Sequence, residues 1–341
     1  MSADIDRLQI QERIANLCKP PGSLGVIERV AEQLCLTQGT LHPKTRPRSA
    51  TIFAADHGVV SEGVSAWPSS ITAAVVKQMQ LARTASGVFA QQLDCDFGIV
   101  DVGLLEPIEH REARMLDCAD RRGSGNLRRE AAMSEADFQH AWKVGSDIAK
   151  ADCNRGMRVL IGGEMGIGNT TSATCLIALL CGLESETEIK SMVGPGAGAS
   201  DEQLERKREV VLRSIERVRS LGDLAPIQVG CQVGGLEIVA LAGYYAAGAT
   251  GGCSVVVDGV IASAAALLAE AIQPDIRMRM IAGHRSTEPA QQIAHQHLSL
   301  DPILDLQMRL GEASGALAAL PIIDLAAAMI NDMASLNELE G

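Results

Sequence analysis

VLIGGEMGIGNTTSA, at residues 159–173, joins an apolar run to a glycine-rich turn and then to a segment rich in threonine and serine. The apolar part predicts a buried strand, and the last part predicts the start of a helix. Glycines let backbone N–H groups approach an anion closely, and the first turn of a helix offers N–H groups that lack intrahelical partners. The stretch therefore predicts a strand–loop–helix unit that binds a phosphate. An ordinary strand-to-helix turn, with Asn169 or Thr170 as the N-cap, is the alternative.

The same stretch matches neither of two common nucleotide-binding motifs. No lysine follows its last glycine, so it is not a P-loop, and its glycines do not have the GxGxxG spacing of a dinucleotide-binding turn. A phosphate would therefore be held by loop amides and by cations that come from elsewhere in the chain.

Several other apolar runs also end in a turn that contains Gly or Asp and then lead into a helical pattern. Strands that alternate with helices predict a Rossmann-like parallel α/β sheet with helices on both faces, whose site lies at the carboxyl ends of the strands. The polar residues 104–140 are expected to form a loop or excursion. The predicted strands cover residues 49–55, 97–102, 158–161, 254–257 and 278–282.

The two ends of the chain have a different pattern from the middle. Residues 1–38 predict helices interrupted at KPPG, and residues 303–338 predict a helix, a glycine-rich break and a long apolar helix. We expect both ends to pack together. The predicted organisation is a small helical subdomain from 1–45 and 303–341, beside a large α/β domain at 46–302 that carries the substrate site.

Composition limits the class of partner. The 341 residues carry a formal net charge of −12 without a basic cluster, which argues against binding to nucleic acid or to an anionic membrane. Nine cysteines occur without any CxxC pair, so we expect reduced, buried thiols and no metal site. The first residues are too charged for a signal peptide, and the apolar runs 233–249 and 253–272 contain acidic residues. The expected location is the cytoplasm.

RLGEASGA, at residues 309–316, places Glu312 in a glycine-flanked break before the last helix. A carboxylate among apolar neighbours has a raised pKa and can act as a general base near neutral pH. From its spacing alone, Glu312 is as well explained as a helix-capping residue.

Other candidate residues follow predicted strand ends. Asp56-His57 suits either a catalytic pair or a hydrogen-bonded turn, and the turn is favoured for a single pair of this kind. Ser286 could hold a sugar hydroxyl or cap a helix. The cluster VGPGAG at 193–198, with Lys207 beyond it, could form a second face of an anion site, although a plain loop is favoured for the cluster on its own. His295 and His297 are expected on the surface.

Taken together, the motifs resemble those of the CobT family of nicotinate-nucleotide–dimethylbenzimidazole phosphoribosyltransferases. The resemblance covers about residues 10–337 and is most specific in FAADHG, GGEMGIGNTT and RLGE. The matching stretches, in order, are KPPGSLG (19–25), FAADHGV (53–59), EGVSAWP (62–68), GGEMGIGNTTSA (162–173), VGGLEIVALAG (233–243), VDG (257–259) and RLGEASGA (309–316).

The resemblance implies a reaction in which nicotinate mononucleotide gives its ribose 5-phosphate to 5,6-dimethylbenzimidazole. It also implies a homodimer in cobalamin biosynthesis, with no metal or organic cofactor. Glu312 matches the general base, and Glu164 matches a second carboxylate near the base and the ribose. The positions expected to bind substrate are Asp56, His57, Trp67, Gly166, Asn169, Thr170, Gly196, Lys207, Ser286 and Arg309.

One position departs from the family pattern. Where well-studied members have a Gln that helps to hold the base, this chain has Val75, and Trp67 precedes the nearby proline. Adenine or a phenolic compound therefore remains an alternative acceptor. A nucleotide-binding oxidoreductase and a non-catalytic nucleotide sensor are further alternatives. The missing GxGxxG argues against the first, and the presence of Glu312 and Glu164 argues against the second.

Overall fold

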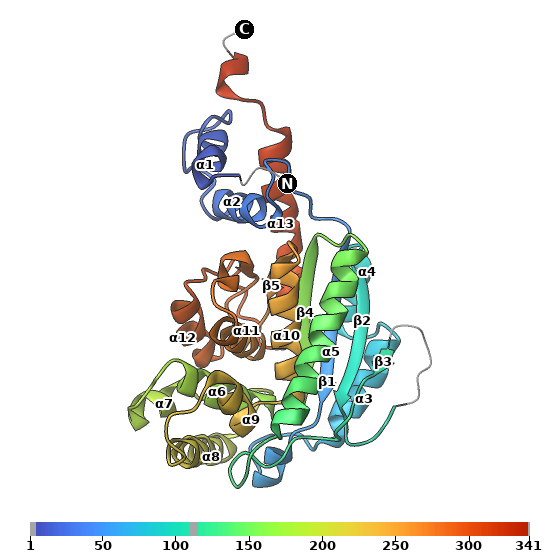
Figure 1. The fold of residues 1–341 in the computed structure, drawn as a ribbon, viewed down its shortest axis with the longest axis vertical. Coiled ribbons are helices and arrows are strands. Elements are labelled where there is room, and N and C mark those ends of the chain that lie inside the picture. Colours follow the sequence, from blue (N-terminus) through green and yellow to red (C-terminus); the bar gives the residue numbers. More distant parts are fainter. Residues whose placement is uncertain (1–4, 109–114, 340–341) are drawn as a thin grey trace.

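The computed structural model describes residues 5–108 and 115–339, which form a six-stranded sheet covered by helices (Figure 1). All strand pairs are parallel, and the strand order is β3-β2-β1-β4-β5-β6. The order reverses direction between β1 and β4, and open sheets of this kind bind ligands outside the carboxyl ends of the strands at such a point. The strands are β1 (Arg48–Ala55), β2 (Asp96–Gly103), β3 (Met115–Asp117), β4 (Val159–Met165), β5 (Ser254–Val257) and β6 (Met280–Ala282).

The central strands are buried on both faces. Every residue of β1 and β4 is buried, as expected for a parallel sheet between two helical layers. Alternate residues of β1 join different hydrophobic clusters: Phe53 and Ala55 belong to one, and Ile52 and Ala54 belong to the other. The period-2 alternation of side chains thus assigns one helical layer to each face of the sheet. The predicted Rossmann-like fold is confirmed.

The first hydrophobic cluster, to which Phe53 and Ala55 belong, includes the helices that follow β3 in the chain, except for the last long helix. The helices α5 and α10 pack against each other across this face (Figure 1). These helices are α5 (Glu135–Asn154), α6 (Asn169–Leu180), α7 (Glu186–Met192), α8 (Asp201–Arg219), α9 (Pro226–Val233), α10 (Leu236–Thr250), α11 (Val260–Ile272) and α12 (Pro289–Leu298).

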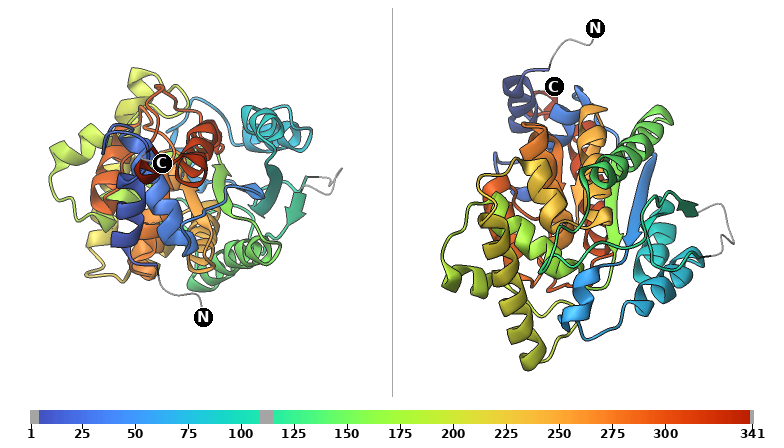
Figure 2. Two further views of the ribbon diagram at one scale, coloured as in Figure 1. Left: turned by 90° about the horizontal axis from the view of Figure 1, so that it is seen from above. Right: turned by 60° about the horizontal axis from the view of Figure 1, so that its bottom comes forward.

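The second cluster joins the two ends of the chain. It contains α1 (Arg7–Ala15), α2 (Val26–Gln38), α3 (Ser70–Gln80), α4 (Ala85–Gln92) and α13 (Ser314–Asp332). Two views from other sides also place α1 and α2 beside α13 (Figure 2). The expected packing of both ends is therefore present. Because α13 also shares this cluster with strand residues, the division into 1–45 with 303–341 and 46–302 remains a proposal.

The helix predicted before the glycine-rich break is absent, and this part of the prediction was wrong. Residues 303–310 run in an extended course beside the loop that follows β6. The N–H of Arg285 donates to the carbonyl of Leu304 at 2.7 Å, and the N–H of Thr287 donates to that of Met308 at 3.2 Å. These carbonyls bond to the neighbouring loop, and not within a helix.

Two smaller expectations also need correction. The segment 104–140 is not only a loop, since it contains β3 and the start of α5, while residues 109–114 lie outside the described part. Only three residues long, β3 is too short for its pattern to stand out. His295 is buried in α12, where its Nε2 lies 3.2 Å from Ser263 Oγ, while His297 is exposed as expected.

Among the described residues, one helix is long and apolar enough to cross a bilayer. This is α13, and 61% of its apolar window is buried inside the fold. Such burial is typical of a core helix, and α13 carries the second hydrophobic cluster.

Candidate active site

A cavity of about 330 Å³ lies at the carboxyl ends of the central and following strands. Its wall combines the end of β4, the first turn of α6, the first residues of α11, one side of α3 and the turn before α13. The position agrees with the reversal of strand order between β1 and β4. Of the strand-end turns selected from the sequence, those after β4, β5 and β6 therefore meet around one cavity.

Two carboxylates come together at its floor. Glu164 lies near the end of β4, and Glu312 precedes α13, so 148 residues separate them in the chain. Both are buried, and the N–H of Glu312 donates to Oε1 of Glu164 at 3.4 Å. The glycines on either side allow this approach: a Cβ at Gly163 would lie 2.7 Å from the backbone N of Ala313, and one at Gly311 would lie 2.6 Å from Oε1 of Glu164.

The turn that carries Glu312 has an uncommon backbone. Glu312 and Ala313 have φ angles of +58° and +64°, in the left-handed region that residues with a side chain seldom adopt. Such conformations persist where the surrounding structure fixes them, and they concentrate at functional sites. Here the turn places Glu312 in the lining of the cavity.

Burial changes the proton affinity of both carboxylates. Burial raises the pKa of Glu312 to about 7, with a further contribution from the charge of Asp258. The pKa of Glu164 is raised to about 8, mainly by burial and then by repulsion from the charges of Glu237 and Asp258. A hydrogen bond from Asn169 lowers this pKa in part. A carboxylate with a pKa near 7 is suited to accept a proton at neutral pH.

The start of α6 faces the same cavity. Its N-cap is Gly168, which has no side chain to accept from the first turn, and both Asn169 and Thr170 line the cavity. The amide of Asn169 donates to Oε2 of Glu164. The positive end of a helix therefore lies beside Gly166 and the two carboxylates, which favours an anion there. The N–H groups of Asn169 and Thr171 already donate to the carbonyls of Gly166 and Gly168.

Lys207 reaches this region from α8. Its Nζ donates to Oγ1 of Thr170 at 2.9 Å and to the carbonyl of Gly194 at 2.8 Å, behind the wall of the cavity. Burial lowers the pKa of Lys207 to about 8, against the attraction of Glu288. Lys207 thus contacts both the glycine cluster at 193–198 and the first turn of α6. The sequence had not decided whether this cluster and Lys207 belong to one site.

The outer rim combines two further segments. The guanidinium of Arg309 donates to the carbonyl of Gly196 at 3.0 Å, and the indole N–H of Trp67 donates to the carbonyl of Ala197 at 3.3 Å. Ser286 also lines the cavity, from the loop after β6. These contacts bring the expected rim residues together over the carboxylates.

Part of the cavity lining is apolar. Ile71 and Val75 from α3 contribute to it, as do Met165 and Ile167 at and after the end of β4 and Ile261 from α11. Polar residues line it as well, among them Glu164, Asn169 and Ser286. The cavity thus offers apolar side chains for a flat ring and polar groups for a sugar phosphate.

Asp56 and His57 do not line this cavity, which differs from the expectation that they contact the substrate. Both are buried behind Gly166: Oδ2 of Asp56 accepts from the N–H of Leu105 at 2.9 Å, and Nε2 of His57 lies 2.6 Å from Glu237 Oε1. Partners inside the fold hold these side chains, so they support the site from behind.

The sequence did not assign a role to four polar residues of this region. Asp258 and His284 follow β5 and β6 closely, a position that could have marked them, whereas Glu237 lies in the first turn of the otherwise apolar helix α10. Glu288 lines the cavity and accepts from the N–H of Gly196 at 2.8 Å. In the described part of the chain, no three His, Cys, Asp or Glu side chains lie close enough together to hold a metal ion.

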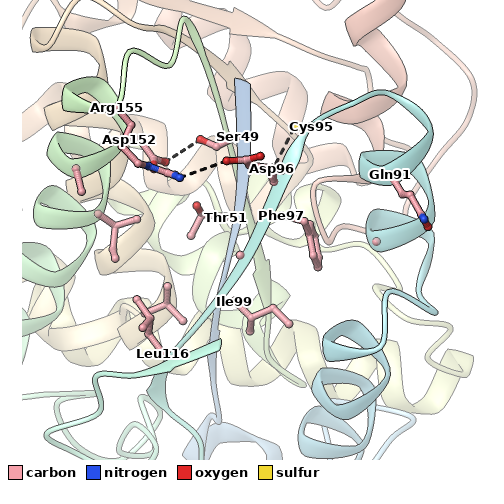
Figure 3. A pocket seen from close by; sticks show the side chains of 16 residues that line it. Ser49, Thr51, Gln91, Cys95, Asp96, Phe97, Ile99, Leu116, Asp152 and Arg155 are labelled. Atoms are coloured by element: carbon pink, nitrogen blue, oxygen red, sulfur yellow. Dashed lines mark hydrogen bonds and ion pairs between the residues drawn. The ribbon is translucent and has the colours of Figure 1, made fainter. Parts of the chain in front are cut away.

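A larger cavity, of about 500 Å³, lies at another part of the sheet (Figure 3). Asp152 and Arg155 from the end of α5 face Ser49 and Asp96 there, close to the amino ends of β1 and β2. Because the raised carboxyl pKa values and the helix start of α6 belong to the other cavity, we place the chemistry there in spite of its smaller volume.

Comparisons with known proteins identify the family of the chain. The sequence profile of a family described as Phosphoribosyltransferase matches residues 4–340. Nicotinate-nucleotide–dimethylbenzimidazole phosphoribosyltransferase from Chromobacterium violaceum is 41% identical over 331 residues, with 96% of this chain and 93% of that protein covered. The Thermus thermophilus protein of the same name is 38% identical over 330 residues, with 97% of this chain and 96% of that protein covered. A crystal structure of CobT from Thermus thermophilus has a TM-score of 0.92 at 37% identity, with 98% of each chain covered.

Proposed function

The chain belongs to the family of nicotinate-nucleotide–dimethylbenzimidazole phosphoribosyltransferases, and we propose that it catalyses the transfer of ribose 5-phosphate in the cavity at Glu312. Ribose 5-phosphate moves from nicotinate mononucleotide to 5,6-dimethylbenzimidazole, giving α-ribazole 5′-phosphate and nicotinate. The observation that carries the proposal is the pairing of Glu312 with Glu164 beside the start of α6.

Glu312 acts as the general base in this proposal. Its carboxylate takes the N–H proton of the benzimidazole, while the other ring nitrogen attacks the anomeric carbon. The bond from that carbon to the nicotinate nitrogen breaks, and its electron pair returns to the pyridinium ring, so no acid is needed. Proton transfer to a placed base contributes roughly 10²–10⁴-fold to such a rate.

Glu164 acts beside the sugar. A negative charge near the anomeric carbon stabilises the positive charge that develops there in the transition state. With a pKa of about 8, Glu164 holds a proton near neutral pH in the empty site, and a cationic pyridinium nearby would favour its ionised form. The two carboxylates thus have different roles because their surroundings differ.

The lining of the cavity determines the orientation of the substrates. The phosphate is bound by the start of α6 and the 193–198 loop, with Lys207 and Arg309 as the nearest cations. The acceptor ring packs on the apolar side, against Ile71 and Val75. An exocyclic amine placed on that side would lose hydrogen bonds to water without replacement, which favours a methylated benzimidazole over adenine.

An acceptor panel tests the proposal. Nicotinate release from nicotinate mononucleotide is followed by chromatography with 5,6-dimethylbenzimidazole, adenine and a phenol as acceptors. We expect the highest kcat/KM with dimethylbenzimidazole. Binding of the mononucleotide without release of nicotinate in the presence of any acceptor would contradict the proposed activity and favour a sensor.

We also propose a cytoplasmic homodimer. The support is the family, the buried position of α13 and exposed apolar side chains at the rim, among them Trp67 and Leu310. Light scattering coupled to gel filtration measures the assembly, and a mass equal to the 36.0 kDa of one chain would contradict the dimer.

A further inference from the structure

The helix that follows the catalytic turn has no cap of its own. The N-cap position of α13 is Ala313, whose methyl group cannot accept a hydrogen bond. The acceptor comes from another part of the sheet: Oδ1 of Asp258, in the turn after β5, accepts from the N–H of Ala316 at 2.8 Å. Both groups are buried, so water does not compete for this bond. Asp258 thus replaces the missing N-cap at the first turn beyond Glu312.

We propose that Asp258 is a positioning residue that caps α13 and opposes the positive end of this helix, so that Glu312 remains basic enough to take the acceptor proton. The inference rests on the proposed function, in which Glu312 is the base. It adds a residue from a different strand end that controls both the geometry and the strength of that base.

The physical reason lies in the helix end. The first turn of a helix carries the equivalent of about half a positive charge, which stabilises a nearby carboxylate and lowers its pKa. Glu312 stands just before α13 and would be weakened as a base by this charge. A buried carboxylate that binds the same N–H groups reduces the effect. In agreement, the pKa of Glu312 is raised by burial first and then by the charge of Asp258.

His284 approaches the same oxygen of Asp258. Its Nε2 is 3.5 Å from Oδ1 of Asp258, and both side chains are buried. Burial lowers the pKa of His284, but hydrogen bonding and charge attraction from Asp258 outweigh this and raise it overall. Protonated His284 would cancel the charge of Asp258, so the pair adjusts the field at Glu312.

Other charged groups face the same region and remain unchanged in the test. Apart from Asp258 and His284, they come from several elements around the cavity. They are Glu164 near the end of β4, Glu237 in α10 with His57, Glu288 before α12, Lys207 in α8 and Arg309 before the turn.

The pH profile of kcat/KM separates a change of base strength from a loss of structure. Asp258→Asn keeps an oxygen that can accept from Ala316 but removes the charge. We expect the acidic limb of its profile, where kcat/KM rises with pH, to lie about one pH unit lower than in the unchanged protein. The maximum value of kcat/KM should be a few-fold lower, because the base is weaker. The ionisation of the acceptor itself is common to both proteins, so the difference between them reports the enzyme.

Asp152→Asn is the matched control. Asp152 is also buried and hydrogen-bonded, to Ser49 Oγ at 2.7 Å, but it lies by the amino end of β1 (Figure 3). We expect its acidic limb to stay in place. His284→Gln, which removes a side chain that can carry a positive charge beside Asp258, is expected to move the limb to higher pH, and it serves as the second test if Asp258→Asn does not fold.

The outcomes distinguish the two proposals. A folded, active Asp258→Asn with an unmoved limb overturns the inference, and so does an unmoved limb in His284→Gln when the first variant does not fold. Absence of transfer in the unchanged protein would instead contradict the proposed function. A limb that moves down with Asp258→Asn and stays with Asp152→Asn supports the inference.

Discussion

The backbone N–H of Glu312 points at Oε1 of Glu164, 3.4 Å away, and so joins the end of a central strand to the turn before the last long helix. This contact holds the two carboxyl groups in one desolvated region. A proton on an acidic group in such a place is retained to higher pH than on a free carboxyl.

Glu312→Gln should abolish most of the turnover while leaving the binding of nicotinate mononucleotide nearly unchanged. The amide keeps the shape of the side chain but cannot accept the proton, so kcat should fall by roughly 10²–10⁴-fold. Single-turnover chromatography measures the rate, and calorimetry measures the affinity. Glu202→Gln, at an exposed position of α8, is the control. Full activity of Glu312→Gln would contradict its role as base.

The activity should depend on pH through the same group. Burial raises the pKa of Glu312 to about 7, and only the ionised form accepts a proton. The value of kcat/KM should therefore rise with pH and level off above about 7. An acidic limb near the ordinary carboxyl value of 4.5 would show that a different group acts as the base.

Stability should fall as the pH rises, because of Glu164. The folded protein retains the proton of this carboxyl up to about pH 8, whereas the unfolded chain releases it near 4.5. Between these values the unfolded state binds fewer protons, so the free energy of unfolding decreases with pH. One unit of pKa difference corresponds to about 1.4 kcal/mol.

Glu164→Gln tests this decrease. The amide stays neutral and can still accept from Asn169, so the decrease between about pH 5 and pH 9 should be smaller in the variant by at least about 1 kcal/mol. Urea unfolding at several pH values measures the difference, with Glu202→Gln again as the control. Parallel curves for the variant and the unchanged protein would argue against a protonated Glu164.

Lys207→Met should weaken the binding of the phosphate. Lys207 is buried and bonded to Thr170 and Gly194, next to the start of α6. Loss of a charge-assisted interaction of about 1.5–3 kcal/mol predicts an increase of KM for nicotinate mononucleotide of roughly 10–100-fold. Nicotinate riboside, which lacks the phosphate, should react with similar KM in both proteins.

The control for this change is Lys190→Met, at an exposed position of α7. It should leave both KM values unaltered. An equal loss for the mononucleotide and the riboside in Lys207→Met would indicate structural damage instead of a phosphate contact.

Val75→Gln should change the preference among acceptors. Val75 belongs to the apolar wall, and a glutamine there would offer hydrogen bonds to a polar ring edge. We expect the ratio of kcat/KM for adenine over dimethylbenzimidazole to rise by roughly tenfold, since a buried polar contact is worth about 1–3 kcal/mol. Val75→Leu keeps the wall apolar and should leave the ratio within a few-fold. An unchanged ratio in Val75→Gln would place the ring elsewhere.

Much of the fold was predictable because its signals are local. Apolar runs that end at Asp56 and Asp258 mark strand ends, and helical patterns between them imply parallel pairing. The predicted end at Ile161 was too early, because β4 continues through two glycines to Met165. The edge strand β3 was missed because three residues give no reliable period. The course of residues 303–310 was predicted incorrectly because its carbonyls bond to a loop that the helical pattern does not include.

The sequence by itself determined the parallel sheet, most of the strand ends, the glycine-rich turn that leads into α6 and, through its ordered motifs, the family. Only the tertiary structure decided that Glu164 and Glu312 share one buried floor, that Lys207 stands behind Thr170 and that Asp258 caps α13. Periodicity records which face of each element is apolar, and this is enough to build layers. It does not record which distant polar groups lose their water together, and this shared desolvation sets the pKa values on which the chemistry depends.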